Sequence, residues 1–501
     1  MWWCVIGLAL AGGGDGDDDR ERVKAVDFEF AADVLAGSFG ATPGGAQDIT
    51  YFRDRVAAGE VPLPEVFTPE GLFSEHDLPL VPSRACERLL CAELRATEAR
   101  LAAQPDARWL AQVGFTSGLT EATYHRPPVS LVAVIDKSCS MSGEPIDTVK
   151  RSLVAMIDQL GPEDQLAIVT YGSDVATVLP PTSATDRRVL REAVERVAID
   201  GSTNLEAGLT RGYELARAAR RSFDGVSRVV LFTDERPNTG RTDAASFMAM
   251  AEAASRGHVG TTTIGVGTQF GAELAQQVSS VRGGNLFFFS DPGTMQEKIA
   301  SDFAMMFTEL AYDLDLVVTP KPGMKVAGVY GVPGDAVRWT EGGALQLHVS
   351  TVFLSRDDGA IYVAFAPDGP MPASGRPELG AIALSYDPRD GERSTATSTV
   401  RSGPLADGDL GLSRGRLLVD EVTTLKRATA LHHHDNDQDG AWQEVHGLLQ
   451  RLEAAGDPAL SKEIELVSAL DATLARLAGR SGEVPVSGGG RDPVTGLPTL
   501  R

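Results

Sequence analysis

The chain contains 501 residues, of which 43% are hydrophobic, so it is long enough for two or more domains with buried cores. Lysine and arginine total 46 against 69 aspartates and glutamates, which gives a net charge of −23 at pH 7. This charge argues against nucleic acid and anionic membranes as main partners, because both are polyanions.

The first 25 residues resemble an export signal followed by an acidic linker. Residues 2–11 form an apolar run that ends in small residues, and an acidic tract from Asp15 to Asp19 follows. A run of this length is too short to span a bilayer as a helix, but it matches the hydrophobic part of a cleaved signal. We therefore expect an extracytoplasmic protein (periplasmic, cell-envelope or secreted). A cytoplasmic location is the alternative, because no Lys or Arg precedes the run. No later segment predicts a transmembrane helix.

Residues 26–125 predict an N-terminal region with a short helix and a β-hairpin. The helix begins near Asp48 and ends at Gly59, because glycine commonly terminates helices. Residues 88–98 and 108–116 alternate apolar and polar side chains, as the two strands of a hairpin do.

The four cysteines are too few for a disulfide-rich scaffold. Cys86 and Cys91 lie five positions apart, a spacing that a regular helix cannot bridge but an irregular loop can. The sequence therefore leaves two alternatives, which are a disulfide that closes a small loop and two free buried thiols.

Residues 126–308 alternate between predicted strands and helices. Residues 129–135 are almost continuously apolar, which is typical of a strand covered on both faces. Pro145 begins a helix whose apolar side chains recur at helical spacing. Further strands are predicted at 166–171, 226–233, 259–266 and 285–289, and further helices after Asp186, from Leu205, and near 243–256, 271–281 and 294–307. The pattern predicts an α/β doubly wound (Rossmann-like) domain with a mostly parallel sheet.

The remainder of the chain predicts two further folded segments. Residues 309–402 contain five short apolar segments separated by Gly, Pro and Asp turns, which indicates a flanking antiparallel β-sandwich. Residues 413–478 predict a C-terminal segment of three amphipathic helices. Residues 479–501 are rich in Gly and Pro and predict a disordered tail.

Oxygen-bearing side chains follow the first strand of the α/β domain. Asp136 ends that strand, and Ser138 and Ser140 lie on the loop after it. Ligands of open α/β sheets bind beyond the carboxyl ends of the strands. A carboxylate and two hydroxyls are hard oxygen donors, which Mg²⁺ and Mn²⁺ prefer. The motif alone is weak evidence, because three fixed positions recur often by chance.

Two more segments bring oxygen donors to the same region. Thr203 lies between two predicted helices, and Asp234 follows a second apolar strand. Taken singly, each residue could be a helix cap or a turn residue. In this order and in this fold, however, the three segments together favour a common cation site.

These residues resemble the metal-ion-dependent adhesion site (MIDAS) of von Willebrand factor type A (VWA) domains, the family that residues 126–308 resemble throughout. The five matching positions are Asp136, Ser138, Ser140, Thr203 and Asp234. The resemblance implies that the serines bind Mg²⁺ (or Mn²⁺ or Ca²⁺) through their hydroxyls. It implies that the threonine binds directly or through water and that the aspartates act largely through water. It also implies that a protein partner presents an acidic side chain to the metal.

The loop departs from the family at Cys139, where VWA domains usually have glycine. Thiols are poor Mg²⁺ ligands, so we expect Cys139 to pack away from the cation. A positive φ at this position would strain a cysteine. Lys137 is compatible with the family pattern, and we expect it to be a solvated surface residue.

Residues 51–64 and 70–73 resemble the short N-terminal region of one bacterial branch of VWA proteins. In that branch, strands before and after the A domain pair with one another. The resemblance implies that the hairpin near 88–116 joins the strands of 310–400 in one β-sandwich, with the A domain inserted at its edge.

We therefore expect a non-enzymatic module for divalent-metal-dependent protein–protein binding in adhesion or assembly. Neither a Gly-x-Ser-x-Gly nucleophile motif nor a His-Glu-x-x-His zinc motif occurs in the chain. Two alternatives remain. One is a metal-dependent hydrolase at the same site, which requires a second metal or a general base. The other is a structural envelope scaffold with a metal-free VWA domain.

Overall fold

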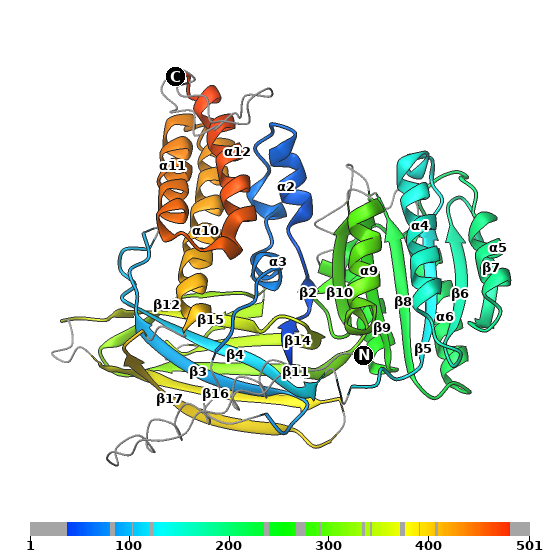
Figure 1. The fold of residues 1–501 in the computed structure, drawn as a ribbon, viewed down its shortest axis with the longest axis horizontal. Helices are drawn as coiled ribbons and strands as arrows, with labels where there is room; N and C mark the ends of the chain where they lie inside the picture. Colours follow the sequence, from blue (N-terminus) through cyan, green and yellow to red (C-terminus); the bar gives the residue numbers. More distant parts are fainter. Residues whose placement is uncertain are drawn as a thin grey trace, which may run out of the picture.

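The computed structural model describes residues 38–480 except for 81–85, 103, 121, 123, 235–239, 267–276, 290–291, 333–335, 341–342, 371–375, 390 and 406–408. The signal-like segment, the acidic linker and residues 481–501 of the predicted tail lie outside the described residues. An α/β domain lies beside a large antiparallel sheet, and a group of helices covers one face of that sheet (Figure 1).

The α/β domain is built on a seven-stranded sheet with the order β2-β10-β9-β8-β5-β6-β7. Its strands are β2 (Gly45–Ala46), β5 (Val129–Asp136), β6 (Gln165–Tyr171), β7 (Val175–Ser183), β8 (Val226–Thr233), β9 (Val259–Val266) and β10 (Gly284–Phe289). Every pair is parallel except β6–β7. β5 is buried along its whole length, as its apolar sequence predicts. The doubly wound fold predicted for this segment is therefore present, with two additional edge strands, β2 and β7.

Helices cover both faces of this sheet. They are α4 (Glu144–Gln159), α5 (Arg187–Glu195), α6 (Leu205–Arg220), α7 (Ala244–Arg256) and α9 (Pro292–Met306). Apolar residues of α4, α5 and α9 share one buried cluster with the sheet. Those of α6 and α7 share the cluster on the other face. Loops at the carboxyl ends of the strands are therefore left free to form a site.

The second sheet has ten strands and closes on itself. Its order is β1-β14-β11-β16-β17-β3-β4-β15-β12, with β13 paired to β14 and an additional pairing between β1 and β4. The strands are β1 (Ser38–Pro43), β3 (Cys91–Glu98), β4 (Trp109–Thr120), β11 (Glu309–Pro320), β12 (Met324–Tyr330), β13 (Val337–Trp339), β14 (Leu345–Ser355), β15 (Gly359–Pro367), β16 (Glu378–Pro388) and β17 (Ser394–Gly403). We expected two stacked sheets. Instead, β1–β4 and β17–β3 pairing makes one continuous sheet around a shared core.

The predicted hairpin belongs to this sheet. β3 and β4 pair with each other, β4 pairs with β15, and the end of β3 pairs with the end of β17. Apart from β2, the α/β domain follows β4 and precedes β11 in the chain, so strands on both sides of it meet in one sheet.

Helices from both ends of the described chain cover the outer face of β4 and β15. They are α2 (Thr50–Ala57), α3 (Pro69–Ser74), α10 (Leu410–His433), α11 (Gln438–Ala455) and α12 (Ser461–Leu477). Their apolar side chains share one buried cluster with Leu110 of β4 and Tyr362 of β15. Figure 1 shows α2 between α12 and the α/β domain. Among the described residues, no helix is both long and apolar enough to cross a membrane.

Two features join the sheets. The chain passes directly from β1 in the ten-stranded sheet to β2 in the seven-stranded sheet, and Asp48 then accepts a hydrogen bond from the backbone N–H of Phe288 at 3.1 Å. In addition, Arg228 of β8 is fully buried and forms an ion pair with Glu309, the first residue of β11. The arrangement therefore fixes the α/β domain against the larger sheet.

Cys86 and Cys91 form a disulfide, which decides between the two alternatives. β3 begins at Cys91, so the segment is not helical and the two sulfurs can meet. Cys139 is a free, exposed thiol. Alkylation of the native protein is expected to label Cys139, and to label Cys86 and Cys91 only after reduction. Mass spectrometry of tryptic peptides checks this, and labelling of Cys86 without reductant would contradict it.

Gly212 allows α6 to lie close to β5. A Cβ atom at this position would come within 2.5 Å of Val134 Cγ2. Gly212→Ala is therefore expected to lower the free energy of unfolding by about 1–3 kcal/mol, the usual cost of overpacking. Gly447→Ala in α11 is the control, because the atom nearest to its Cβ is the flexible end of Arg451 at 3.3 Å. Alanine favours helix by up to about 1 kcal/mol over glycine. Urea denaturation measures both, and equal effects would contradict the close packing.

Candidate functional site

The five predicted site residues lie on three loops of the α/β domain. Asp136 is the last residue of β5, and Asp234 follows β8, which pairs with β5 in parallel. Ser138 and Ser140 lie between β5 and α4, and Thr203 lies just before α6. The carboxyl ends of parallel strands share one edge of a sheet, so the first two loops necessarily meet there.

Asp136 is the most buried of the five residues, with no exposed surface. Its carboxylate accepts hydrogen bonds from the backbone N–H of Ser138 at 2.8 Å and from the hydroxyl of Thr233 at 3.3 Å. Burial raises the pKa of Asp136, although hydrogen bonds from Ser138 and Thr233 oppose this effect. The carboxylate is thus held in place by donors that favour its ionised form.

Hydrogen bonds link the two serines to Asp234. The Ser138 and Ser140 hydroxyl oxygens are 2.9 Å apart, and the Ser140 hydroxyl donates to Asp234 Oδ1 at 3.1 Å. Residues Cys139–Met141 form a short 3-10 helix, and Gly143 has a φ of 85° immediately before α4 begins. Only glycine adopts this φ readily, so Gly143 allows the loop to turn sharply into the helix.

Backbone hydrogen bonds bring the Thr203 loop against the Asp136 loop. The N–H of Cys139 donates to the carbonyl of Gly201 at 3.2 Å, and the N–H of Asp200 donates to the carbonyl of Lys137 at 2.7 Å. Thr203 itself is 1% exposed. The structure therefore brings all three loops together, and hydrogen bonds link Asp136, Ser138, Ser140 and Asp234 in one contiguous set of contacts.

The expectation for Lys137 was wrong. Its side chain is buried rather than solvated, and its ammonium group forms ion pairs with Asp174 and, at 3.1 Å, with Asp200. These carboxylates raise the pKa of Lys137 although burial opposes them. Lys137 therefore stabilises the two loops that flank the site, which its position in the motif alone does not reveal.

That Cys139 points away from the cation remains a prediction. Its thiol is exposed, and its residue belongs to the 3-10 helix. Among the described residues other than glycine, a positive φ occurs only at His258, Asp313 and Asn436. Cysteine therefore causes no backbone strain at this loop position.

Sequence reasoning missed Tyr171. It is the last residue of β6, is fully buried, and packs against Gly208 of α6, where a Cβ would come within 2.6 Å of the tyrosine ring. Burial, followed by the charge of Asp136, raises the pKa of Tyr171 far above its usual range. The sequence signal that could have revealed Tyr171 is its position. It is a large residue at the carboxyl end of the strand beside β5, and that position borders the site.

The donor set fits a hard divalent cation. Asp136 is a buried carboxylate that forms no ion pair with a Lys, Arg or His of the described residues, and such a charge needs compensation. The neighbouring donors are hydroxyls and one further carboxylate, which suit Mg²⁺ with retained waters. Within the described ranges, no group of three His, Cys, Asp or Glu side chains could hold a metal ion. A cation here would therefore depend on the serine and threonine hydroxyls.

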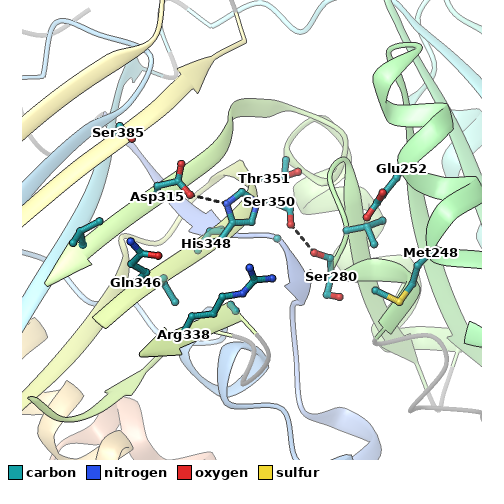
Figure 2. Close-up of a pocket in the computed structure, with 16 residues that line it drawn as sticks. Met248, Glu252, Ser280, Asp315, Arg338, Gln346, His348, Ser350, Thr351 and Ser385 are labelled. Atoms are coloured by element: carbon teal, nitrogen blue, oxygen red, sulfur yellow. Dashed lines mark hydrogen bonds and ion pairs between the residues drawn. The ribbon is translucent and has the colours of Figure 1, made fainter. Parts of the chain in front are cut away.

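A concavity of about 780 Å³ lies between the α/β domain and the outer face of β11, β13 and β14 (Figure 2). Arg338 extends into it, His348 bonds to Asp315 at 2.8 Å, and the Ser350 hydroxyl donates to the Ser280 carbonyl at 2.9 Å. Ser280 precedes β10, so this wall lies at the amino-terminal ends of the parallel strands. The concavity is thus separate from the Asp136 site.

Comparison with known proteins identifies relatives of the α/β domain. Residues 130–301 match the family model described as von Willebrand factor type A domain. The chain is 29% identical over 200 residues to the uncharacterized protein YfbK of Escherichia coli, which covers 39% of this chain and 34% of that protein. It is 24% identical over 194 residues to human inter-alpha-trypsin inhibitor heavy chain H1, covering 37% and 21% of the two chains. These matches span about a third or less of the relatives' length.

One solved structure resembles most of the described architecture. It is a von Willebrand factor type A protein from Catenulispora acidiphila, with a TM-score of 0.51 and 14% sequence identity. The match covers 79% of this chain and 97% of that chain. At this identity, the likeness concerns the fold.

Proposed function

We propose that this chain binds protein partners through a divalent cation at its Asp136 loop. Residues 130–301 form a von Willebrand factor type A domain, and domains of this type serve in general as protein-interaction modules. The observation that carries the proposal is the buried Asp136 carboxylate, surrounded by hydroxyl donors and without a cationic side chain paired to it among the described residues. The proposed ligands are Asp136, Ser138, Ser140, Thr203 and Asp234.

Each proposed ligand has a distinct task. The hydroxyls of Ser138 and Ser140 would bind the cation directly, and Thr203 would bind it directly or through water. Asp136 and Asp234 would balance its charge, largely through bound water. Mg²⁺ suits this set best, with Mn²⁺ or Ca²⁺ as alternatives. The bound cation would provide an open coordination position for the acidic side chain of a partner, a charge-assisted contact.

The proposed role is binding in adhesion or assembly rather than catalysis, in an extracytoplasmic compartment. The Cys86–Cys91 disulfide supports that location, because disulfides persist in oxidising compartments. The net charge of −23 opposes the approach of an acidic partner at long range. The cation would therefore have to attract such a partner locally.

Affinity capture tests the proposal. The full chain is immobilised, and protein retained in Mg²⁺ is eluted with EDTA. We expect EDTA to release specific partners from the wild-type column, and an Asp136→Asn column to retain none of them. Equal retention by both columns, or retention that EDTA does not change, would contradict a metal-dependent interface. A chain that binds no Mg²⁺ in a calorimetric titration would instead support the scaffold alternative.

A further inference from the structure

A second cleft, of about 520 Å³, lies between α2, α12 and the end of β10. In the seven-stranded sheet, β9 and β8 separate β10 from β5, so this cleft is distinct from the Asp136 site. Part of its wall is apolar, formed by Val56 of α2, Leu466 and Ala469 of α12, and Phe289 of β10. These side chains offer a surface for a hydrocarbon chain.

Carboxylates gather at the N-terminus of α2, at one end of the cleft. Asp48 accepts a hydrogen bond from the N–H of Thr50 at 3.0 Å, and Glu75 accepts one from the N–H of Ile49 at 2.7 Å. Arg53 is the cation of this cluster, and it pairs with Glu75 at 2.8 Å. Glu75 is not the only carboxylate that pairs with Arg53 among the described residues, however.

Arg53 is shared with a further carboxylate. It also pairs with Glu463 of α12 at 2.7 Å, and that carboxylate is fully buried. One guanidinium therefore faces the negative charges of Glu75 and Glu463, and Glu463 also contacts His76 Nε2 at 2.9 Å. None of the ion pairs within the described part of the chain includes Asp48. Burial, with the added charge of Glu75, raises the pKa of Asp48 to about 6. Among the described residues, no cationic side chain thus pairs with Asp48 at this end of the cleft.

The other charged groups of the cleft leave this imbalance in place. Lys298 pairs with Asp302 at 2.7 Å, and Lys462 and Glu465 are exposed side by side on α12. Asp357, from the turn between β14 and β15, adds a second half-buried carboxyl, and burial together with the charge of Asp77 raises its pKa. A ligand that brings one positive charge would therefore compensate buried negative charge.

We propose that this cleft binds a primary ammonium group carried on an apolar stem. The ammonium would lie beside Asp48, and the stem would pack on Val56, Leu466 and Ala469. A lysyl side chain of a protein partner and a free diamine share this chemistry. The site needs no metal, so its occupancy is independent of the cation at Asp136.

Calorimetric titration of the full chain in EDTA tests the proposal with three probes. They are N-acetyl-lysine methylamide, 1,5-diaminopentane and 1-pentanol. Both amines are expected to bind about tenfold or more tightly than the alcohol. Tighter binding of the lysine derivative favours a protein source, and tighter binding of the diamine favours a free amine. Equal binding of alcohol and amines, or no binding of any probe, would overturn the proposal.

Acidification provides a second readout. The charged side chains that line the cleft with Asp48 are Arg53, Glu75, Lys298, Asp357, Lys462 and Glu465. A protonated carboxyl is neutral, so amine affinity is expected to fall as the pH decreases through about 6, the pKa of Asp48. Because the bound ammonium favours ionised Asp48, binding near this pH should release protons. An affinity that is constant across this range would overturn the assignment of Asp48.

Amine binding by variants of the cleft tests where the ligand binds. Asp48→Asn is expected to weaken amine binding about tenfold or more, whereas Glu465→Gln, at the exposed rim, should leave it within about twofold. If Asp48→Asn does not fold, Ala469→Leu serves instead, because the larger side chain fills the apolar part of the cleft. Unchanged amine binding by Ala469→Leu would place the ligand elsewhere and overturn the proposal.

Discussion

Asp136→Asn is expected to weaken Mg²⁺ binding about a hundredfold while the protein remains folded. Asparagine has the same shape, and its oxygen can still accept the hydrogen bond from the Ser138 N–H while its amide N–H donates to the Thr233 hydroxyl oxygen, but it has no charge to balance the cation. Calorimetric titration with Mg²⁺ measures the affinity. The matched control is Asp174→Asn, which removes an exposed carboxylate that pairs with Lys137 and should change the affinity no more than about threefold.

The stability of this variant provides an independent check. Burial raises the folded-state pKa of Asp136, so the wild type loses stability as the pH rises from the unfolded pKa through the folded one. Without metal at neutral pH, Asp136→Asn should therefore unfold at the same temperature as the wild type or higher. With Mg²⁺, only the wild type should gain stability. An equal gain in both proteins would mean that the cation binds elsewhere.

Arg228→Met is expected to lower the free energy of unfolding by about 3–5 kcal/mol, the usual cost of removing one partner of a buried ion pair. The Arg228 guanidinium donates to Thr262 Oγ1 at 3.0 Å and to the Gly283 carbonyl at 3.1 Å, and it pairs with Glu309. It also lies 5.3 Å from the centre of the Phe353 ring. Methionine fills similar space but leaves Glu309 without its cationic partner, although the Tyr312 hydroxyl still donates to it. Urea denaturation, followed by circular dichroism, measures the loss.

Two further variants separate charge from packing. Arg188→Met removes an exposed pair with Glu192 and should cost no more than about 0.5 kcal/mol. The double variant Arg228→Met/Glu309→Gln should recover part of the stability, because no unpaired buried carboxylate remains. If Arg228→Met alone proves as mild as Arg188→Met, the pair does not hold the two sheets together.

The α/β domain could be predicted from sequence because its signals are local. Parallel strands buried on both faces are continuous apolar runs, and each is followed by a helix with regular apolar spacing. β1 and β2 gave no such signal, because they are short and contain glycine, and because β1 pairs with β14 and β2 pairs with β10, both more than 200 positions away. β1 also pairs with β4, about 80 positions away. The ten-stranded sheet differed from the expected sandwich for the same reason, since β1 is one of the strands that close it.

The sequence predicted the position of those candidate-site residues that come at or directly after the end of a strand. Asp136 and Asp234 come directly after apolar strands, so their position at one sheet edge follows from the fold. The burial of Lys137 could not be predicted, because it depends on Asp174 and Asp200, which come from two other loops. Neighbours of this kind are set by loop packing rather than by a sequence period.

The passage of the chain from β1 into β2 has a consequence for the order of folding. β2 pairs with β10 about 240 positions later, and β1 pairs with β14 about 315 positions later as well as with β4 about 80 positions later. During synthesis, β2 and the edge of β1 that pairs with β14 must therefore wait until most of the polypeptide has emerged, whereas β5 to β9 can assemble among themselves. Distant pairings of this kind form slowly. The nascent N-terminal segment would thus stay extended for long enough to be recognised by a chaperone or threaded through an export channel before the molecule closes.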